Sequence, residues 1–110
     1  MKLPNSESAY VSREKLTNYL LSEEHPVGSS KAKFFRGLGF SEKNITELTR
    51  SLLKIAKSGE VEEIRRFPYG INYAIDGKIT TPVGDEVKIK TVWFIKTGQT
   101  IPSFITAYPV

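Results

Sequence analysis

The spacing of apolar residues changes near Gly59, from a helical period before it to a strand period after it. The strongest helical stripe repeats at three- and four-residue intervals, and most charged side chains lie off the stripe. We expect its helix to begin at Ser41, which can cap it, and to end at Ser58-Gly59. The stripe comprises Ile45, Leu48, Leu52, Ile55 and Ala56.

Two shorter helices are expected before this one. The first covers residues 12–22, is capped by Ser12 and places Tyr19 on the same side as its leucines. The second covers about residues 29–38, begins at a serine cap and ends at Gly39, which can adopt the left-handed conformation that stops a helix. The segment between these helices contains a proline and a glycine, so we expect a loop there.

After Gly59, apolar and polar residues alternate, which is typical of strands. Residues 61–67 are a charged strand candidate, whereas residues 69–75 and 87–95 alternate cleanly, and the end of the latter is apolar on both faces, as in a central strand. Residues 101–108 form a last strand, which its flanking prolines keep short or at an edge. The expected turns are Asp76-Gly77, Pro82 to Asp85, and Thr97 to Gln99.

Helices followed by a meander of strands indicate an α+β fold. We expect about three N-terminal helices packed on one face of a C-terminal antiparallel sheet of about four strands. Residues 1–110 are expected to form a single domain, with a helical part over about 12–58 and a sheet part over about 60–108.

The composition narrows the chemistry that the chain can perform. Of its 110 residues, 39% are hydrophobic and 25% are charged, as in ordinary globular domains. The absence of cysteine excludes disulfides, thiolate nucleophiles and cysteine-ligated metals, and a single histidine excludes a histidine-rich metal site. We therefore expect no metal and no other cofactor. No signal peptide and no apolar run of about 20 residues is visible, so we expect a cytoplasmic chain, or a domain cut from a larger one, with no membrane segment.

One segment combines the only histidine with a basic helix start; it reads HPVGSSKAKFF from His25 onward. Imidazole is the side chain that titrates nearest neutral pH, so His25 is either a proton carrier or a structural residue of the loop. Ser29 and Ser30 lie where a helix presents free backbone N–H groups to an anion. Lys31 and Lys33 add positive charge there, or simply form a solvated helix face. The spaced glycines of a nucleoside-triphosphate loop are missing, so a single phosphodiester fits better.

The overall charge gives only mild support to this interpretation. The net charge of +4 favours an anionic partner, but surface lysines commonly serve solubility alone. Arg36 extends the basic segment around the start of the second helix, and lysines between Lys88 and Lys96 form another. If the two segments meet in the folded chain, they form one basic patch.

Polar residues on the predicted strands are further candidates. Tyr69 can stack on a base or orient a phosphate, although tyrosines in such positions more often pack between strands. Thr91 interrupts an apolar strand face, and its hydroxyl is either satisfied within the sheet or directed into a concave site. The same two alternatives apply to Thr106 and Tyr108, which share a face of the last strand.

The sequence also resembles an uncharacterised bacterial family of proteins of about this length. The resemblance lies in LPN near the start, in EHPVG, KAKFF and LGF between Glu23 and Phe40, and in the YG and DG pairs between Tyr69 and Gly84. Its most specific patterns are HPxGxxKAxxF and TVWxIxxGxxxPxxxTAYP, and it spans nearly the whole chain. Members of that family occur as small free-standing proteins beside a short partner gene, and similar domains end large secreted or phage-borne toxins.

This setting, with helices before a four-stranded sheet, is similar to the barnase, EndoU, colicin and RelE group of ribonucleases. Those enzymes cleave RNA without a metal, by attack of the ribose 2′-hydroxyl on the adjacent phosphate. The single histidine of this chain excludes the two-histidine pair of the EndoU type. By position, the resemblance implies a site that comprises His25, Lys31 or Lys33, Tyr69, Thr91 and Thr106, with Tyr108 as a further candidate. Together with the helix start described above, the candidate catalytic residues are His25, Lys31, Tyr69, Thr91 and Thr106. The candidate nucleic-acid contacts are Ser29, Ser30, Lys33, Arg36 and Tyr108.

The leading hypothesis is therefore a metal-independent, toxin-like ribonuclease in which His25 moves a proton and lysines hold the phosphate. RNA and a small cognate partner or inhibitor protein are the expected partners. The alternative is a non-enzymatic protein-interaction module whose basic face docks an acidic partner and whose histidine is structural. A third hypothesis is RNA binding without cleavage.

Overall fold

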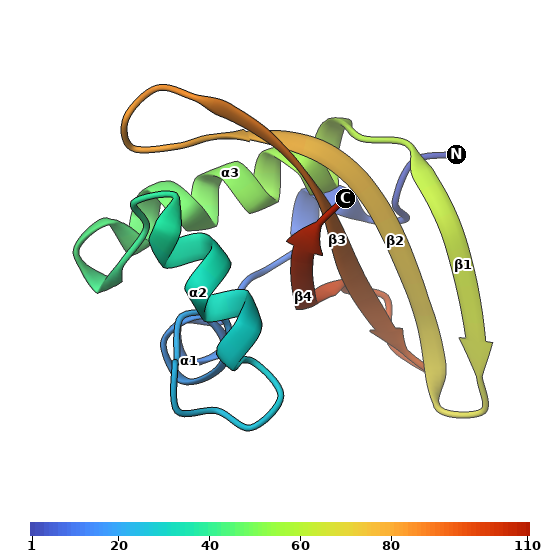
Figure 1. Cartoon of the computed structure of the whole chain (residues 1–110). Coiled ribbons are helices and arrows are strands. Elements are labelled where there is room, and N and C mark those ends of the chain that lie inside the picture. The colour runs from blue at the N-terminus through green and yellow to red at the C-terminus, as the bar shows by residue number, and fades with distance from the viewer.

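The computed structural model describes residues 1–110, and it has helices followed by a four-stranded antiparallel sheet in the order β1-β2-β3-β4. The predicted α+β architecture is thus confirmed. In Figure 1, α3 crosses one face of the sheet, and α1 and α2 lie beside β4. The elements are η1 (Ser6–Ser8), α1 (Arg13–Lys15), η2 (Leu16–Leu20), α2 (Ser29–Gly37), η3 (Glu42–Asn44), α3 (Ile45–Ser58), β1 (Val61–Phe67), β2 (Gly70–Thr80), β3 (Glu86–Lys96) and β4 (Ser103–Pro109).

The first predicted helix forms as α1 followed directly by the wider turn η2. Ser12 caps it as predicted, because its hydroxyl accepts a hydrogen bond from the Lys15 N–H at 3.0 Å. The Leu21 N–H donates to the carbonyl of Leu16, five residues earlier, at 2.8 Å, which is the bond of a π-helical turn. Leu16, Leu20 and Leu21 are all fully buried, so this wide turn anchors the N-terminal helix in the core.

The second helix, α2, follows Gly28 without a side-chain cap, so the predicted serine cap is wrong. Its predicted end is confirmed, because Gly39 has a φ of 101°, a conformation that a side chain would strain. Ala32 and Phe35 face the core from this helix. The start of α2 therefore keeps backbone N–H groups that no side chain of its own satisfies.

The third helix, α3, forms where the sequence predicts it. The Ser41 hydroxyl accepts from the Lys43 N–H at 3.2 Å, and the Ser41 N–H donates to Asn44 Oδ1 at 2.8 Å, which fixes the start of η3 and α3. The helix ends at Ser58, as predicted. Every residue of the predicted apolar stripe is buried, and each of its isoleucine and leucine side chains contributes about 1.5–3 kcal/mol to folding.

The core lies between α3, the N-terminal helices and one face of the sheet. β2 and β3 direct Ile75, Ile89 and Trp93 into it. β4 contributes Phe104, whose ring packs edge-on near Trp93, with centroids 5.5 Å apart and planes at 69°. β3 pairs on both sides, with β2 and β4, so its predicted central position is confirmed. The opposite face of the sheet carries the alternate residues of the same strands.

The predicted turn at Asp76-Gly77 is wrong, because β2 runs through it. Asp76 pairs with Lys90 and Gly77 pairs with Ile89 in the ladder with β3. The Asp76 carboxylate accepts a 2.7 Å bond from Lys90 Nζ, which gives an acidic residue a partner inside the sheet. Gly77 passes beneath α3, where a Cβ atom would lie 2.7 Å from Ile55 Cγ1. The glycine here permits close packing and does not mark a turn.

The other two predicted turns are confirmed. Thr81 N–H donates to the Asp85 carbonyl at 2.7 Å across the β2–β3 turn, and Gly98 has a φ of 83° in the β3–β4 turn. β4 lies at an edge of the sheet, and the N-terminal segment adds one parallel bridge to it, from Tyr10 to Ser103. None of the helices has the length and apolar character that spanning a membrane would require.

Candidate functional site

The loop before α2 is organised by the His25 side chain. Its Nδ1 accepts hydrogen bonds from the N–H groups of Val27 at 3.1 Å and Gly28 at 3.0 Å. The His25 carbonyl also accepts from the Ser29 N–H at 3.0 Å. Because Nδ1 is an acceptor, the proton of the neutral ring resides on Nε2, which has no hydrogen-bond partner within the protein. In the His25 side chain, Nδ1 therefore holds the loop in place, whereas Nε2–H is free to donate a hydrogen bond.

Tyr19 in η2 packs against this loop. A Cβ atom on Gly28 would lie 2.5 Å from the Tyr19 carbonyl oxygen, so only glycine lets the loop approach so closely. The His25 ring meets the Tyr19 ring edge-on, with centroids 5.0 Å apart and planes at 90°. The imidazole is consequently held between its own loop and an aromatic ring.

The same tyrosine connects the helical part to the sheet. Its hydroxyl lies 2.9 Å from Thr106 Oγ1 on β4, close enough for either group to donate. Lys31 Nζ lies 5.9 Å and Lys15 Nζ 4.7 Å from the centroid of its ring, within cation–π range. His25, Lys31 and Thr106, three of the predicted site residues, thus meet around Tyr19. We name these four residues the Tyr19 cluster.

Two hollows adjoin the Tyr19 cluster. One lies between α2 and the end of β4 and is lined by Ser30, Lys31 and Tyr108, among others. The second, about 280 Å³ in volume, lies on the sheet face opposite α3 and includes Thr106 and Tyr108 in its lining. Because Tyr108 lines both hollows, they are neighbours. We name the second hollow the sheet groove; its other lining residues are Glu63, Arg65, Asn72, Ala74, Val92 and Ile105.

The start of α2 retains part of the predicted anion site. The N–H groups of Gly28 and Ser29 are already bonded to His25, so they are not available to a ligand. The N–H groups of Ser30 and Lys31 have no acceptor within the protein, and they lie at the positive end of the helix dipole. Lys31 therefore combines a free backbone donor with an ammonium group that reaches the Tyr19 ring.

Thr91 does not join this cluster. It is fully buried, and its hydroxyl donates to the Ile75 carbonyl at 2.9 Å while accepting from the Trp93 indole N–H at 2.8 Å. Of the two alternatives that the sequence leaves open, satisfaction within the sheet is the one found here. The structure leaves this hydroxyl no access to an RNA phosphate, so we do not include Thr91 in the candidate site, and its predicted catalytic role stays a prediction.

Tyr69 and Lys33 also lie apart from the cluster. Tyr69 is 61% exposed in the β1–β2 turn, where its ring stacks on Phe67 at 5.2 Å. The adjacent end of β3 is Lys96, four residues or about 13 Å along the strand from the row that contains Thr106. Lys33 is an exposed residue of α2 that makes no ion pair. Neither residue contacts His25, and their predicted roles stay predictions.

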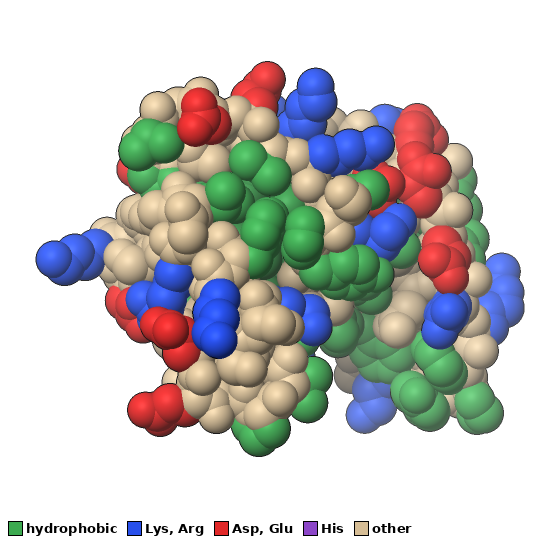
Figure 2. Space-filling view, in the orientation of Figure 1, with side chains coloured by type: hydrophobic (Ala, Val, Ile, Leu, Met, Phe, Trp, Pro, Cys, Tyr) green, Lys and Arg blue, Asp and Glu red, His purple; other side chains and the backbone are tan.

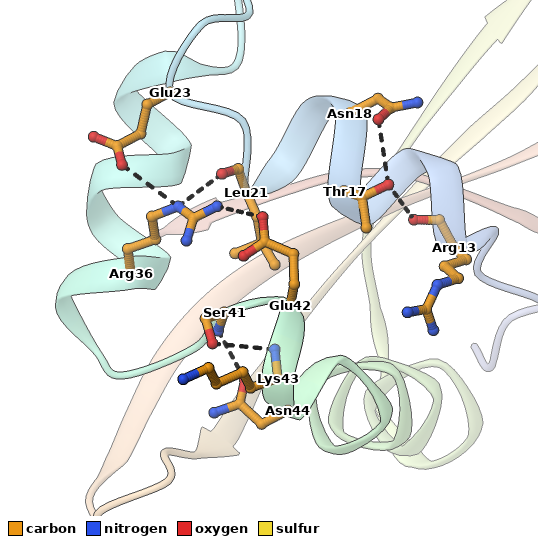
Figure 3. Close-up of polar contacts among 10 residues, drawn as sticks. All are labelled: Arg13, Thr17, Asn18, Leu21, Glu23, Arg36, Ser41, Glu42, Lys43 and Asn44. Carbon is orange, nitrogen blue, oxygen red and sulfur yellow. Dashed lines mark hydrogen bonds and ion pairs between the residues drawn. The ribbon is translucent and has the colours of Figure 1, made fainter.

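Arg36, which the sequence predicts to contact nucleic acid, makes contacts within the protein instead. Figure 3 shows its guanidinium directed at Leu21, Glu23 and Glu42. Its Nε donates to the Leu21 carbonyl at 2.8 Å, and its terminal nitrogen lies 2.7 Å from a Glu42 oxygen. The hydrogen bond with Glu42 raises the pKa of Arg36 and lowers the pKa of Glu42. The side chain therefore ties α2 to η2 and η3 rather than facing a ligand.

The two basic segments do not form one continuous patch. Lys90 Nζ lies 2.7 Å from Asp76 Oδ1, and this hydrogen bond raises the pKa of Lys90. On the face in Figure 2, acidic and basic side chains alternate, and hydrophobic side chains gather between the helical part and the sheet. Any anion site must therefore be local, and the cations nearest the Tyr19 ring are Lys15 and, at the start of α2, Lys31.

A larger hollow, about 640 Å³, lies between the N-terminal segment and the β3–β4 turn. Its only charged residue is Lys96, and neither the histidine nor any residue of the Tyr19 cluster lines it. We place the candidate site at the smaller hollows because titratable and cationic groups converge there. No three acidic or histidine side chains are arranged to hold a metal ion.

Sequence reasoning missed Tyr19 and the β1 and β2 residues of the sheet groove. The helical period does place Tyr19 with the buried leucines, and only the partly exposed position of its ring distinguishes it from them. Asn72 carries a signal that was available, because it is an uncharged polar residue in the middle of a well-alternating strand. Arg65 and Glu63 were hidden by the irregular, highly charged sequence of β1.

The fold is shared with a solved structure of a toxin assembly. One chain of a contact-dependent growth inhibition toxin–immunity protein complex from Klebsiella pneumoniae 342 superposes with a TM-score of 0.72. The match covers 94% of this chain and 95% of that chain at 14% sequence identity, so it shows a common fold alone. No curated protein matches the sequence significantly. The model of a family described as a domain of unknown function, DUF6883, matches residues 2–110, and the chain therefore belongs to that family.

Proposed function

We propose that the chain is a metal-independent, toxin-like ribonuclease that cleaves RNA by attack of a ribose 2′-hydroxyl on the adjacent phosphodiester. The observation that carries the proposal is the Tyr19 cluster, in which an imidazole, an ammonium group and two hydroxyls converge beside the start of a helix. The shared fold with a chain of a toxin–immunity complex supports the toxin-like part.

The reaction requires three things from the protein. The 2′-hydroxyl must lose a proton, the non-bridging phosphate oxygens must be stabilised as charge develops, and the departing 5′-oxygen must gain a proton. In our proposal the Lys31 ammonium and the free N–H groups of Ser30 and Lys31 hold the phosphate. The Tyr19 hydroxyl, positioned by Thr106 at 2.9 Å, donates to a phosphate oxygen.

His25 has a role that its hydrogen bonds limit. With Nδ1 accepting two backbone hydrogen bonds, the ring presents Nε2–H as a donor to the phosphate. Nε2 can accept a proton only when the neutral ring carries its own proton on Nδ1. After Nε2 has accepted a proton, the imidazolium has an N–H group at both nitrogens. Either state breaks the bonds from Val27 and Gly28, so we infer that proton transfer accompanies a movement of the loop at residues 25–28. In our proposal His25 takes the proton of the 2′-hydroxyl at Nε2, and the resulting imidazolium gives a proton to the departing 5′-oxygen.

The decisive experiment separates the structural end of His25 from its free end. His25→Asn keeps an acceptor for the loop, because an asparagine oxygen can bond to backbone N–H groups two and three residues later, but it removes Nε2. We expect this variant to keep its melting temperature and to cleave RNA at least about 100-fold more slowly than wild type. An active His25→Asn variant would show that the histidine is only structural.

Lys31 and Lys33 form a matched pair for the phosphate contact. Both are lysines of α2, but only Lys31 approaches Tyr19. Lys31→Ala should slow RNA cleavage and lower the slope of log binding constant against log salt by about one, whereas Lys33→Ala should change neither strongly. Equal effects of the two substitutions would contradict the proposed phosphate position.

Tyr19→Phe tests the hydroxyl without disturbing the ring beneath His25. It removes the contact with Thr106 and the proposed donor to phosphate, and we expect cleavage about 100-fold slower. Thr106→Val removes the same contact from the sheet side and should have a smaller effect, because the tyrosine hydroxyl remains. If both variants cleave RNA at the wild-type rate, the cluster is not the catalytic site.

A second candidate function is a non-enzymatic module that binds a small partner protein. The observation that favours it is that the structurally similar chain belongs to a toxin–immunity protein complex. We also propose such a partner for the enzyme, as its inhibitor. Wild-type protein that leaves total RNA intact at every pH between 5 and 9, and yet binds RNA with the Lys31-dependent salt slope, would support RNA binding without cleavage.

A further inference from the structure

The sheet groove lies in a row of residues that crosses all four strands. Glu63 of β1 pairs with Ala74 of β2, Ala74 with Val92 of β3, and Val92 with Thr106 of β4. Paired residues of neighbouring antiparallel strands direct their side chains to the same face. The row therefore ends at Thr106, whose hydroxyl contacts Tyr19, so the groove leads directly to the Tyr19 cluster.

The groove exists because its middle residue is small. Ala74 lies between longer side chains on every side, and the methyl group leaves a depression with an apolar floor of Ala74, Val92 and Ile105. Ile105 reaches this side through the irregularity in the ladder between β3 and β4, which places one extra residue in β4. A flat ring can stack on such a floor. The floor has no polar side chain that would form a hydrogen bond with the edge of the ring.

Polar groups surround this floor on the β1 side. Arg65 pairs with Asn72 in the neighbouring row, and Glu63 Oε2 lies 3.1 Å from Arg65 Nε. Arginine only donates, a carboxylate only accepts, and an asparagine amide does both. Together they match the mixed donors and acceptors of a nucleobase edge. The larger hollow near the β3–β4 turn has no carboxylate and no guanidinium, and Lys96 is its only charged group.

We propose that the sheet groove binds one unpaired nucleobase of the RNA, with its ribose directed towards Thr106 and its phosphate at the Tyr19 cluster. This inference rests on the proposed function for the position of the phosphate. The groove volume of about 280 Å³ lies just below the range of sites that hold drug-sized ligands, about 300–1,000 Å³. One nucleobase therefore fits in the groove and a base pair does not. The floor at Val92 is one strand spacing, about 5 Å, from Thr106, which leaves room for one sugar between base and phosphate.

The proposal predicts a substrate class. Because the groove takes a single base, single-stranded RNA and loops are substrates, and a continuous duplex is not. It also predicts which residue reads the base. Glu63→Gln adds donors to a side chain that only accepts, so it should change the ranking of the four bases and leave the phosphate contact intact.

The binding test uses the full chain and the four nucleoside 3′-monophosphates as probes, followed by NMR. We expect all probes to shift Lys31 and Tyr19 signals, and at least one to shift the methyl signals of Ala74, Val92 and Ile105 as well. Inorganic phosphate should shift only the Lys31 and Tyr19 signals. If the nucleotides produce no more than the inorganic phosphate pattern, the groove does not bind a base and the inference is overturned.

A matched pair of arginines completes the test. Arg65→Ala removes a groove residue, whereas Arg66→Ala removes the same charge from the next position of β1, which faces the other side. Arg65→Ala and Asn72→Ala should each weaken the binding of the preferred nucleotide about tenfold, and Arg66→Ala should change it less than twofold. Equal losses for Arg65→Ala and Arg66→Ala would show a non-specific charge effect and overturn the inference.

Failure of this inference can be told apart from failure of the proposed function. Cleavage of RNA by wild type, with rates that Arg65→Ala and Asn72→Ala leave unchanged, would keep the ribonuclease and overturn the groove. Nucleotide binding in the groove by a wild-type chain that cleaves no RNA would keep the groove and overturn the ribonuclease. Cleavage of a continuous duplex as fast as a single strand would also overturn the groove.

Discussion

Alternate residues of β2 and β3 face opposite sides of the sheet, and the two sides differ in how deeply their side chains are buried. The side towards α3 carries Ile75 and Trp93, both completely buried, and its one polar residue at this level, Thr91, has its hydroxyl satisfied by the sheet and the indole. The opposite side carries Asn72 and Val92, which stay partly exposed around the sheet groove.

This difference teaches where sequence changes should act. Side chains on the α3 side are held by packing, so their loss should appear in the free energy of unfolding. Side chains around the groove have few packing partners, so their loss should appear in binding or cleavage while the fold remains intact. The comparison would be contradicted if a groove substitution lowered the free energy of unfolding strongly, or if a substitution on the α3 side impaired cleavage without affecting stability.

The largest expected effect is on the α3 side. Ile75→Ala removes a fully buried side chain beneath α3 and should lower the free energy of unfolding by about 2–5 kcal/mol. Asn72→Ala lies three residues earlier on the same strand, but on the groove side, and should cost less than about 1 kcal/mol. Urea denaturation of both variants measures this contrast, and losses of similar size would contradict it.

The next effect concerns the buried threonine. Thr91→Val keeps the shape but leaves the Trp93 indole N–H and the Ile75 carbonyl without their partner, at a cost of about 1–3 kcal/mol. Thr91→Ser keeps the hydroxyl and should cost less. Thr91→Val should also cleave RNA at the wild-type rate per folded molecule. Folded but inactive Thr91→Val would instead restore this residue to the catalytic site and break the division between the two sides.

A similar division applies to the basic residues of α2. Arg36→Ala removes the guanidinium that joins the Leu21 carbonyl to Glu42, and it should lower the free energy of unfolding by about 1–2 kcal/mol, whereas the exposed Lys33→Ala should be nearly neutral. Thermal melts of the two variants measure the difference. If Arg36→Ala melts like wild type and binds RNA less tightly, Arg36 is a nucleic-acid contact after all.

Much of the fold could be predicted because local patterns agree with it. The apolar stripe of α3, the capping residues Ser12 and Ser41, and the stop at Gly39 depend on neighbours only a few residues away. Asp76-Gly77 fails for the opposite reason. Its pattern is that of a hairpin turn, but contacts with Lys90 and with α3, both distant in sequence, keep it inside β2.

The candidate site was only partly predictable for the same physical reason. His25 and Lys31 are near in sequence, so their proximity follows from one loop and one helix start. Tyr19 and Thr106 are 87 residues apart, and no local pattern reports a hydrogen bond between them. The extra residue in β4 similarly decides which side chains reach the groove, and a strict alternation misplaces them.

The smallest expected effect tests whether the groove side contributes any stability at all. Lys90 is hydrogen-bonded to Asp76 on this side, and this bond raises the pKa of Lys90 above its ordinary value. A raised pKa in the folded state means that the pair stabilises the fold fully below the unfolded-state pKa and loses this contribution as the pH rises through the folded-state pKa.

Lys90→Met should therefore be less stable than wild type by no more than about 1 kcal/mol at pH 7, and this difference should shrink above about pH 10. The exposed Lys88→Met is the matched control and should show no such pH dependence. Urea denaturation between pH 7 and 11 measures both. If Lys90→Met lowers the free energy of unfolding as much as Ile75→Ala does, the groove side contributes as much to stability as the α3 side. That result would contradict the comparison between the two sides.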